Sequence, residues 1–254
     1  MPFVPSNFYR TSLAGLHQRL QDSALTRTYL TGTGIRLDGT TPNPDDLYEL
    51  PIGIFSIIEF AHLFSVFDNS RVHQQAQHSF GPDEAPPGLY FTISNSHLIQ
   101  HPNKNRLGLY ADPNGGTDLF IDGLHVDHYI LNEHNTPPSL GTVAFALCAI
   151  MGHLAGLSHI SLVAAGGRGF DQRYIGYRVW PKLGFDAPLT QDEVAQAPHL
   201  AHCHTVQDIL ATNAEWWDNH GSQRLMTFDL TANSTSWKKL LLYVDRKLSE
   251  GGLP

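Results

Sequence analysis

The sequence predicts an α/β protein built on a mixed, largely antiparallel sheet that is flanked by helices. Three observations lead to this prediction. Asn114-Gly115 lies between two apolar runs and supplies the positive φ angles of a tight reversal, which indicates an antiparallel hairpin. A stretch of helical period follows between two further apolar runs, and this order is typical of a crossover between parallel strands. A second helical stretch, residues 190–222, precedes the last predicted strand, and we expect it to be an insertion.

The composition restricts the partners that the protein can have. The 254 residues are 41% hydrophobic, enough for a large core, and we expect one domain over 1–254 whose central part covers about 50–190 and 223–248. The net charge of −8 argues against a nucleic-acid duplex or an anionic membrane, although a local basic patch is compatible with it. Two cysteines are too few for a disulfide framework. Since no apolar run reaches the roughly 20 residues of a membrane span, we expect a soluble, cytoplasmic protein.

The N-terminal third is predicted to be mostly helix and loop. Ser6 is a suitable cap for a helix whose apolar residues recur at helical spacing up to Leu20. The turn-forming residues of 31–50 predict a long loop. A second helix is expected over 54–67, apolar on nearly all sides and therefore buried.

The next predicted elements are strands. Residues 81–88, rich in glycine and proline, form a connector, and 89–93 have the β-branched and aromatic content of a strand. The hairpin pairs 107–110 with a long strand over 119–130. The apolar residues of that strand change parity around Gly123, which predicts a β-bulge or a bend there.

A helix should begin at Ser139, which is a good capping residue, and end near Gly156. Residues 159–164 then form a short buried strand. Gly141 lies in the first turn of the helix, where the missing side chain lets another group approach the backbone. Because the N-terminus of a crossover helix favours phosphate, this turn is either a binding site or an ordinary packing helix.

The C-terminal part completes the sheet. We expect a helix over 205–219 and a strand over 224–230, which pairs beside a strand beginning at Phe185. A short amphipathic helix over 236–248 closes the chain.

Two segments carry a family resemblance, Pro138–Ala144 and the string Gly-Tyr-x-x-Trp-Pro-x-x-Gly-Phe-Asp at Gly176–Asp186. Together with the order of elements over about 50–190, they resemble the GCN5-related N-acetyltransferase (GNAT) family. The second string is also similar to an atypical branch of toxin or effector domains.

The resemblance implies an enzyme that moves an acetyl or other acyl group from coenzyme A to an amine of an unidentified acceptor. In the family, a long strand and the start of the following helix bind coenzyme A through backbone N–H groups. Carried over residue by residue, the acetyl-CoA contacts are Tyr129, Ile130, Leu131, Ser139, Leu140, Gly141, Thr142 and Val143.

The chain departs from the family pattern at two places. The family loop has glutamine or arginine, then two residues, a glycine, one residue, and a glycine or alanine. This chain has Pro138 at the first of these positions, and of the two small residues it retains only the first glycine, Gly141. The family also places a tyrosine, the general acid for the departing thiolate, where this chain has Trp180. Since indole is no practical proton donor, Tyr177 or water takes this role, or the chemistry differs.

Candidates for the general base lie on the long strand and on the predicted second helix. Asp122, His125, Asp127 and His128 alternate between the faces of a strand, so only some can face one cleft. Glu59 is costly in an apolar helix unless it is paired or points to solvent. We rank His125 and Glu59 first; the alternative is that these side chains are ordinary surface groups.

The run His199–His204, which includes Cys203, has the ligand types that zinc prefers. A structural zinc site needs four ligands, and no second pair lies nearby. We interpret the run as a surface stretch and expect no metal.

Two further function classes stay open. A member that has lost coenzyme A would be a binding module, and it would release no thiol from any acyl donor. A toxin or effector, delivered into a target cell, would use the fold for another group transfer, and its expression would inhibit growth.

Overall fold

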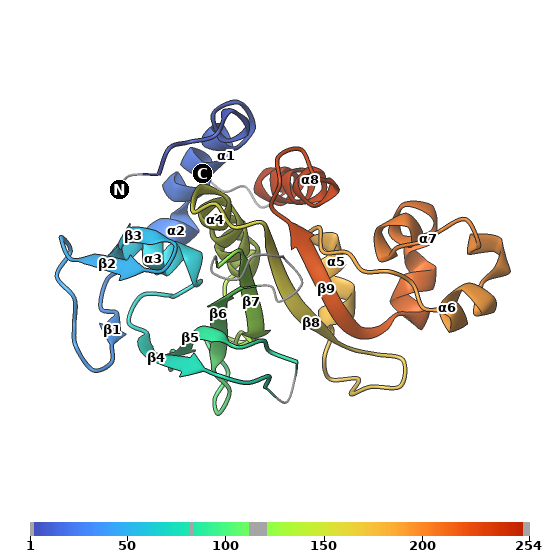
Figure 1. The fold of residues 1–254 in the computed structure, drawn as a ribbon, viewed down its shortest axis with the longest axis horizontal. Helices are drawn as coiled ribbons and strands as arrows, with labels where there is room; N and C mark the ends of the chain where they lie inside the picture. Colours follow the sequence, from blue (N-terminus) through green and yellow to red (C-terminus); the bar gives the residue numbers. More distant parts are fainter. Residues whose placement is uncertain (1–2, 82–83, 112–120, 251–254) are drawn as a thin grey trace.

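The computed structural model describes residues 3–81, 84–111 and 121–250, and among these residues seven strands form one mixed sheet (Figure 1). Adjacent strands are antiparallel except for the pairs β1 with β4 and β7 with β8, which are parallel. The predicted mixed, largely antiparallel sheet is confirmed. In sheet order the strands are β1 (Arg36–Leu37), β4 (Arg71–Gln77), β5 (Gly88–Ser94), β6 (Asn105–Tyr110), β7 (Gly123–His128), β8 (His159–Gly167) and β9 (Ser222–Asp229).

Helices flank this sheet, and α1, α2, α4 and α8 lie together on one side of it (Figure 1). The first helical stretch begins at Asn7 and contains a π-helical segment, Tyr9–Leu13; Ser6 Oγ accepts a hydrogen bond from the Tyr9 N–H at 3.0 Å, as its predicted capping role requires. The α-helices are α1 (Ala14–Asp22), α2 (Ala24–Tyr29), α3 (Ile57–Leu63), α4 (Leu140–Leu154), α5 (Gly176–Lys182), α6 (Gln191–Gln196), α7 (Val206–His220) and α8 (Thr235–Glu250).

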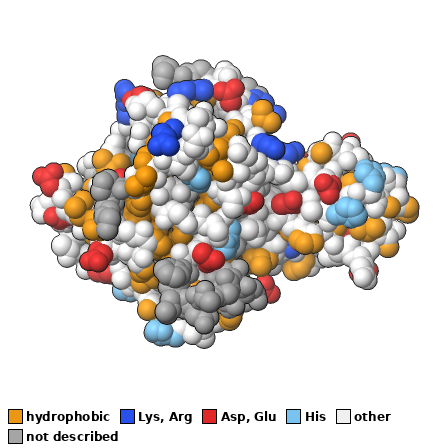
Figure 2. Space-filling model, turned by 45° about the horizontal axis from the view of Figure 1, so that its top comes forward, with side chains coloured by type: hydrophobic (Ala, Val, Ile, Leu, Met, Phe, Trp, Pro, Cys, Tyr) orange, Lys and Arg blue, Asp and Glu red, His pale blue; other side chains and the backbone are white. Residues whose placement is uncertain are grey.

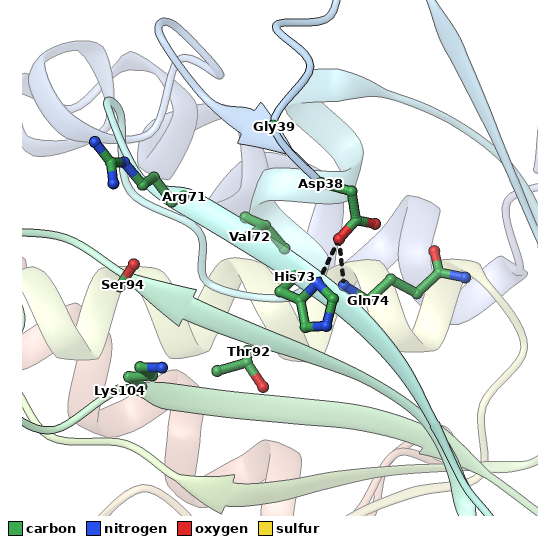
Figure 3. Close-up of a pocket in the computed structure, with 9 residues that line it drawn as sticks. All are labelled: Asp38, Gly39, Arg71, Val72, His73, Gln74, Thr92, Ser94 and Lys104. Atoms are coloured by element: carbon green, nitrogen blue, oxygen red, sulfur yellow. Dashed lines mark hydrogen bonds and ion pairs between the residues drawn. The ribbon is translucent and has the colours of Figure 1, made fainter.

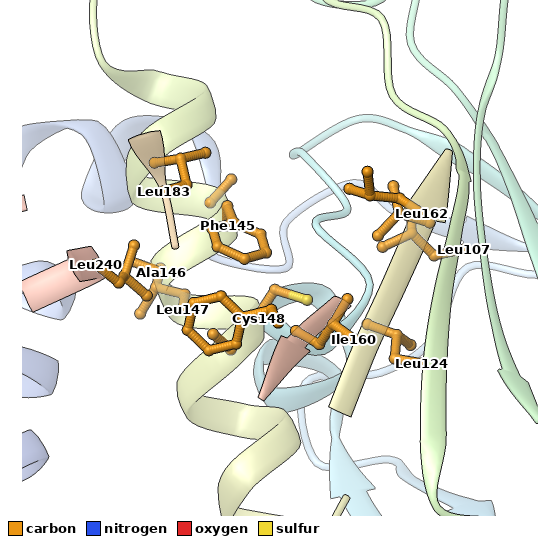
Figure 4. Packing of buried hydrophobic residues seen from close by; sticks show 14 of the residues in the cluster. Leu107, Leu124, Phe145, Ala146, Leu147, Cys148, Ile160, Leu162, Leu183 and Leu240 are labelled. Atoms are coloured by element: carbon orange, nitrogen blue, oxygen red, sulfur yellow. The ribbon is translucent and has the colours of Figure 1, made fainter. Parts of the chain in front are cut away.

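The two faces of the sheet differ in polarity. Alternate residues of the central strands, among them Leu107, Leu124 and Ile160, are fully buried against α4 (Figure 4). They belong to one cluster of buried apolar residues that runs along the chain from Phe8 to Val244. The intervening residues of the same strands point to the opposite face, and many of them are polar.

The predicted crossover unit is present as β7, α4 and β8, and Gly156 ends the helix with a left-handed φ of 81°. The bulge lies four residues later than predicted. Arg106 pairs with His128 whereas Leu107 pairs with Val126, so Asp127 is the extra residue. The Asn114-Gly115 turn lies outside the described residues, and the antiparallel pairing of β6 with β7 is the part of the hairpin that the structure shows.

The predictions for the N-terminal third were partly wrong. Residues 31–50 contain β1 and also β2 (Leu47–Leu50), which pairs with β3 (Gly53–Ser56) as a small hairpin. The second helix therefore begins at residue 57. Ser56 starts it through a capping box, in which Ser56 Oγ accepts from the Glu59 N–H and the Glu59 carboxylate accepts from the Ser56 N–H.

The C-terminal predictions hold with one correction. The segment 190–222 is largely helical, with α6, a 3₁₀ turn (Pro198–Leu200) and α7, and β9 and α8 follow as expected. The chain at Phe185 forms no strand; it meets β9 through one bridge, between Asp186 and Thr227. No described helix is both long and apolar enough to cross a membrane.

Candidate active site at the ends of strands β7 and β8

The two parallel strands separate at their C-terminal ends. They pair from Gly123 with His159 to Val126 with Leu162, and not beyond. Past this point β7 follows β6 through the bulge at Asp127, while β8 continues along β9 to Gly167. The backbone of 127–131 therefore has no sheet partner on the side of β8.

This separation leaves backbone donors free. The Ile130 N–H points toward β6, where it donates to Asn105 Oδ1 at 2.7 Å. Successive N–H groups of an extended chain point in opposite directions, so those of Tyr129 and Leu131 point toward β8. Neither of these two groups has a hydrogen-bond partner within the described residues. Of the three strand residues predicted to bind coenzyme A, Tyr129 and Leu131 thus offer a free donor and Ile130 does not.

The bulge determines which face Tyr129 occupies. An extra residue reverses the alternation of the side chains that follow it. His125 and Tyr129 would share a face in a regular strand, but the extra Asp127 turns Tyr129 toward the helices. Its ring packs edge-on against Trp180 with centroids 5.9 Å apart, and its buried hydroxyl has no partner among the described residues. Burial raises the pKa of this hydroxyl, which makes it a weaker proton donor than an ordinary tyrosine.

The first turn of α4 lies against this segment. A Cβ on Gly141 would lie 3.1 Å from Leu131 Cδ1, so the missing side chain permits close contact between the two. The N–H groups of Gly141 and Thr142 belong to the first turn, which has no carbonyl one turn back to bond them. The structure thus brings together the two groups of residues predicted to bind coenzyme A, the strand end 129–131 and the helix start 139–143.

The predicted cap of α4 was wrong in detail. The Ser139 side chain makes no capping hydrogen bond, and its backbone is left-handed, with a φ of 68°. The turn is held by backbone bonds instead, from Leu140 N–H to the Pro137 carbonyl and from Val143 N–H to the Ser139 carbonyl. A positive φ is uncommon outside glycine, so Ser139 occupies a position that glycine fits better.

His125 lies on the opposite, polar face of β7, in a chain of four residues that we call the His125 network. His125 Nδ1 lies 2.9 Å from Ser161 Oγ, which lies 2.9 Å from the Tyr110 hydroxyl. That hydroxyl lies 2.5 Å from His159 Nε2. The network links His125, which is 1% exposed, to the half-buried His159.

The electrostatics keep His125 neutral. Burial lowers the pKa of its imidazole to about 4, although the nearby Asp127 carboxylate acts in the opposite direction. Its Nε2 is buried and has no hydrogen-bond partner in the described part of the chain. A neutral imidazole with a free nitrogen can accept a proton.

The neighbouring candidates form a separate pair. Asp127 accepts a hydrogen bond from Arg106 at 2.6 Å, and His128 Nδ1 lies 3.3 Å from the same carboxylate oxygen. Arg106 also stacks over the Tyr90 ring and donates to Gln77. Asp127 is therefore occupied as an ion-pair partner.

Glu59 and Tyr177 lie outside this site. The capping box accounts for the Glu59 carboxylate. The Tyr177 hydroxyl donates to the Asp218 carbonyl at 3.1 Å, and the Tyr177 carbonyl accepts from Trp217 Nε1–H. Both contacts attach α5 to α7, so Tyr177 holds the inserted helices in place.

Trp180 packs where the resemblance expects a tyrosine. It makes edge contacts with Phe145 and Phe185, which supports the core-packing interpretation of this residue and of Phe185.

The run His199–His204 lies on the lobe formed by α6 and α7, where histidine side chains gather on the surface (Figure 2). Its three histidines are exposed, whereas Cys203 is buried and lies 3.8 Å from Thr212 Oγ1. Within the described residues, no group of three or more His, Cys, Asp or Glu side chains is placed to hold a metal ion.

Sequence reasoning singled out His125 as a candidate but not the residues linked to it by hydrogen bonds, Tyr110, Ser161 and His159. These residues are brought together by cross-strand register, since Gly123 pairs with both Tyr110 and His159 and His125 pairs with Ser161. A scan of protein-family models finds no match for the chain, nor does a search of curated proteins.

Proposed function

We propose that the protein is an acyltransferase of the GNAT family that moves an acetyl or other acyl group from coenzyme A to an amine. The observation that carries the proposal is the end of the β7–β8 pairing at Val126 and Leu162, beyond which the N–H groups of Tyr129 and Leu131 have no hydrogen-bond partner among the described residues and lie beside the first turn of α4. The order of elements, with antiparallel strands followed by a parallel crossover, supports the family.

The free donors fit the chemistry of coenzyme A. Its pantetheine arm carries amide carbonyls, which the N–H groups of Tyr129 and Leu131 would bind. Its pyrophosphate would bind the N–H groups of Gly141 and Thr142, because a helix N-terminus favours phosphate. Gly141 brings these two sets of donors together through its contact with Leu131.

In this proposal, the acceptor amine attacks the thioester carbonyl, and the C–S bond breaks as the C–N bond forms. His125 accepts the proton that the amine loses, and Ser161 and Tyr110 pass the charge toward His159. Asp127, where β7 leaves β8, is two residues after His125, and this position along the strand supports His125 as the base. The thiolate leaves as the C–S bond breaks and takes its proton from water. No step needs Tyr177.

A binding module without catalysis is the second candidate. The almost complete burial of His125 and the tryptophan at position 180 favour it, since a base must reach its substrate. An assay of thiol release from acetyl-CoA with mixed amine acceptors separates the two candidates, provided that acetyl-CoA binds.

The binding site is tested by a matched pair of variants. Gly141→Asp places a carboxylate where the pyrophosphate would bind, and it should abolish acetyl-CoA binding measured by calorimetry. Gly15→Asp adds the same charge at the second position of another helix, in open space, and should bind as the wild type does. Unchanged binding in Gly141→Asp would disprove the assignment of the α4 turn.

A further inference from the structure

A cavity of about 600 Å³ lies above β4 and β5, toward the β1 edge of the sheet (Figure 3). The register places its side chains on one face, because Arg71 pairs with Ser94 and His73 pairs with Thr92. Lys104 precedes β6 and lies beside Ser94. The intervening residues Val72 and Ile93 point into the core.

The cavity is lined by an excess of positive charge, in a protein whose net charge is −8. Arg71 and Lys104 have no ion-pair partner among the described residues. The lining contains one carboxylate, Asp38, which lies 2.6 Å from His73 Nδ1 and also accepts a hydrogen bond from the Gln74 N–H. Asp38 is thus engaged with His73, and it leaves the two permanent cations available.

The donors match one chemical group. Guanidinium and ammonium groups bind phosphate oxygens through charge-assisted hydrogen bonds, and the Ser94 and Thr92 hydroxyls add neutral donors. The volume exceeds that of inorganic phosphate and is typical of sites for small molecules. We propose that this cavity binds a phosphorylated small molecule, with Arg71 and Lys104 holding the phosphate and His73, oriented by Asp38, beside it.

This site is distinct from the proposed coenzyme A site, which lies at β7, β8 and α4. The two come near each other at β6, where Asn105, the residue after Lys104, binds the Ile130 N–H. A test must therefore measure both ligands.

The test uses the double variant Arg71→Gln/Lys104→Gln. Its control is Arg10→Gln/Lys238→Gln, which removes the same charge from exposed positions elsewhere. Calorimetry at constant ionic strength, adjusted with potassium chloride, measures inorganic phosphate, adenosine monophosphate and glycerol phosphate. We expect saturable binding of at least one compound to the wild type and to the control. In the double variant, the affinity for that compound should be lower by about tenfold or more.

The three compounds separate the sources of the phosphate. Tighter binding of adenosine monophosphate would identify a nucleotide site, and tighter binding of glycerol phosphate a metabolite site. The substituted side chains are exposed, so the melting temperature should not change. No saturable binding to the wild type, or equal binding to the double variant, would overturn the proposal. A parallel loss of acetyl-CoA binding would also overturn it, because the cavity would then belong to the coenzyme A site.

Discussion

Two buried histidines should make the protein sensitive to mild acid. Burial lowers the pKa of His62 and of His125 to about 4 from an ordinary value near 6.5, and the side chains are 2% and 1% exposed. A group with a depressed folded-state pKa takes up its proton more readily in the unfolded chain. The stability that the neutral form provides is therefore complete above about pH 6.5 and is lost as the pH falls toward 4.

The size of this effect follows from the two shifts. As the pH falls from 6.5 to 4.5, the unfolding free energy should decrease by about 2 kcal/mol for each histidine, and by about 4 kcal/mol for both together. A typical domain has only about 5–15 kcal/mol in total. His17, whose pKa burial also lowers, adds to the loss. The pKa values of Asp127 and Glu193 are lowered in the folded protein, so the stability that these two carboxylates contribute is lost at still lower pH. Burial raises the pKa of Asp186, so protonation of this carboxyl group stabilises the fold as the pH falls.

Urea unfolding at half-unit steps from pH 7.5 to 4.5 measures this loss. The matched control is His202→Asn, because the His202 side chain is exposed and lies outside the core, so this substitution should leave the slope unchanged. Imidazole resonances of His62 and His125 should show no titration between pH 8 and 5.5. An unfolding free energy that stays constant from pH 6.5 to 4.5, or a His125 resonance that titrates near 6.5, would refute the reasoning.

Three substitutions test the roles of other residues. Glu59→Gln should weaken the capping box and lower the unfolding free energy by about 1 kcal/mol, with thiol release unchanged; loss of transfer in a folded variant would instead make Glu59 the base. Tyr177→Phe should cost about 1 kcal/mol in urea unfolding through the lost bond to Asp218, and slower transfer at equal acetyl-CoA binding would identify it as the acid. Gly108→Ala should cost about 1–3 kcal/mol, because its Cβ would lie 2.4 Å from the Tyr90 ring; stability equal to that of the wild type would contradict the close packing of these two residues.

The elements with regular periodicity were predictable. The helix and strand of the crossover unit show their apolar spacing directly, and β7, α4 and β8 lie where the sequence placed them. The β2–β3 hairpin was missed because turn-forming residues surround it and Ile54 resembles part of the following helix. The Ser56–Glu59 capping signal was present and would have fixed the start of that helix.

The candidate site was harder to predict, because its geometry depends on register. The bulge at Asp127 decides that Tyr129 faces the helices while His125 faces Ser161. One sequence shows no register, and one added residue reverses every later side chain of a strand. For the same reason Tyr110 and His159, which are 49 residues apart, could not be predicted as neighbours.

The binding of coenzyme A is the central claim, and calorimetric titration of acetyl-CoA into the wild-type protein at neutral pH and moderate salt tests it most directly. Coenzyme A and ATP serve as controls. The account predicts saturable binding that prefers acetyl-CoA and coenzyme A over ATP, because ATP lacks the pantetheine arm that we propose the N–H groups of Tyr129 and Leu131 bind. No heat with either coenzyme A compound, together with no rise in melting temperature at millimolar ligand, would contradict it.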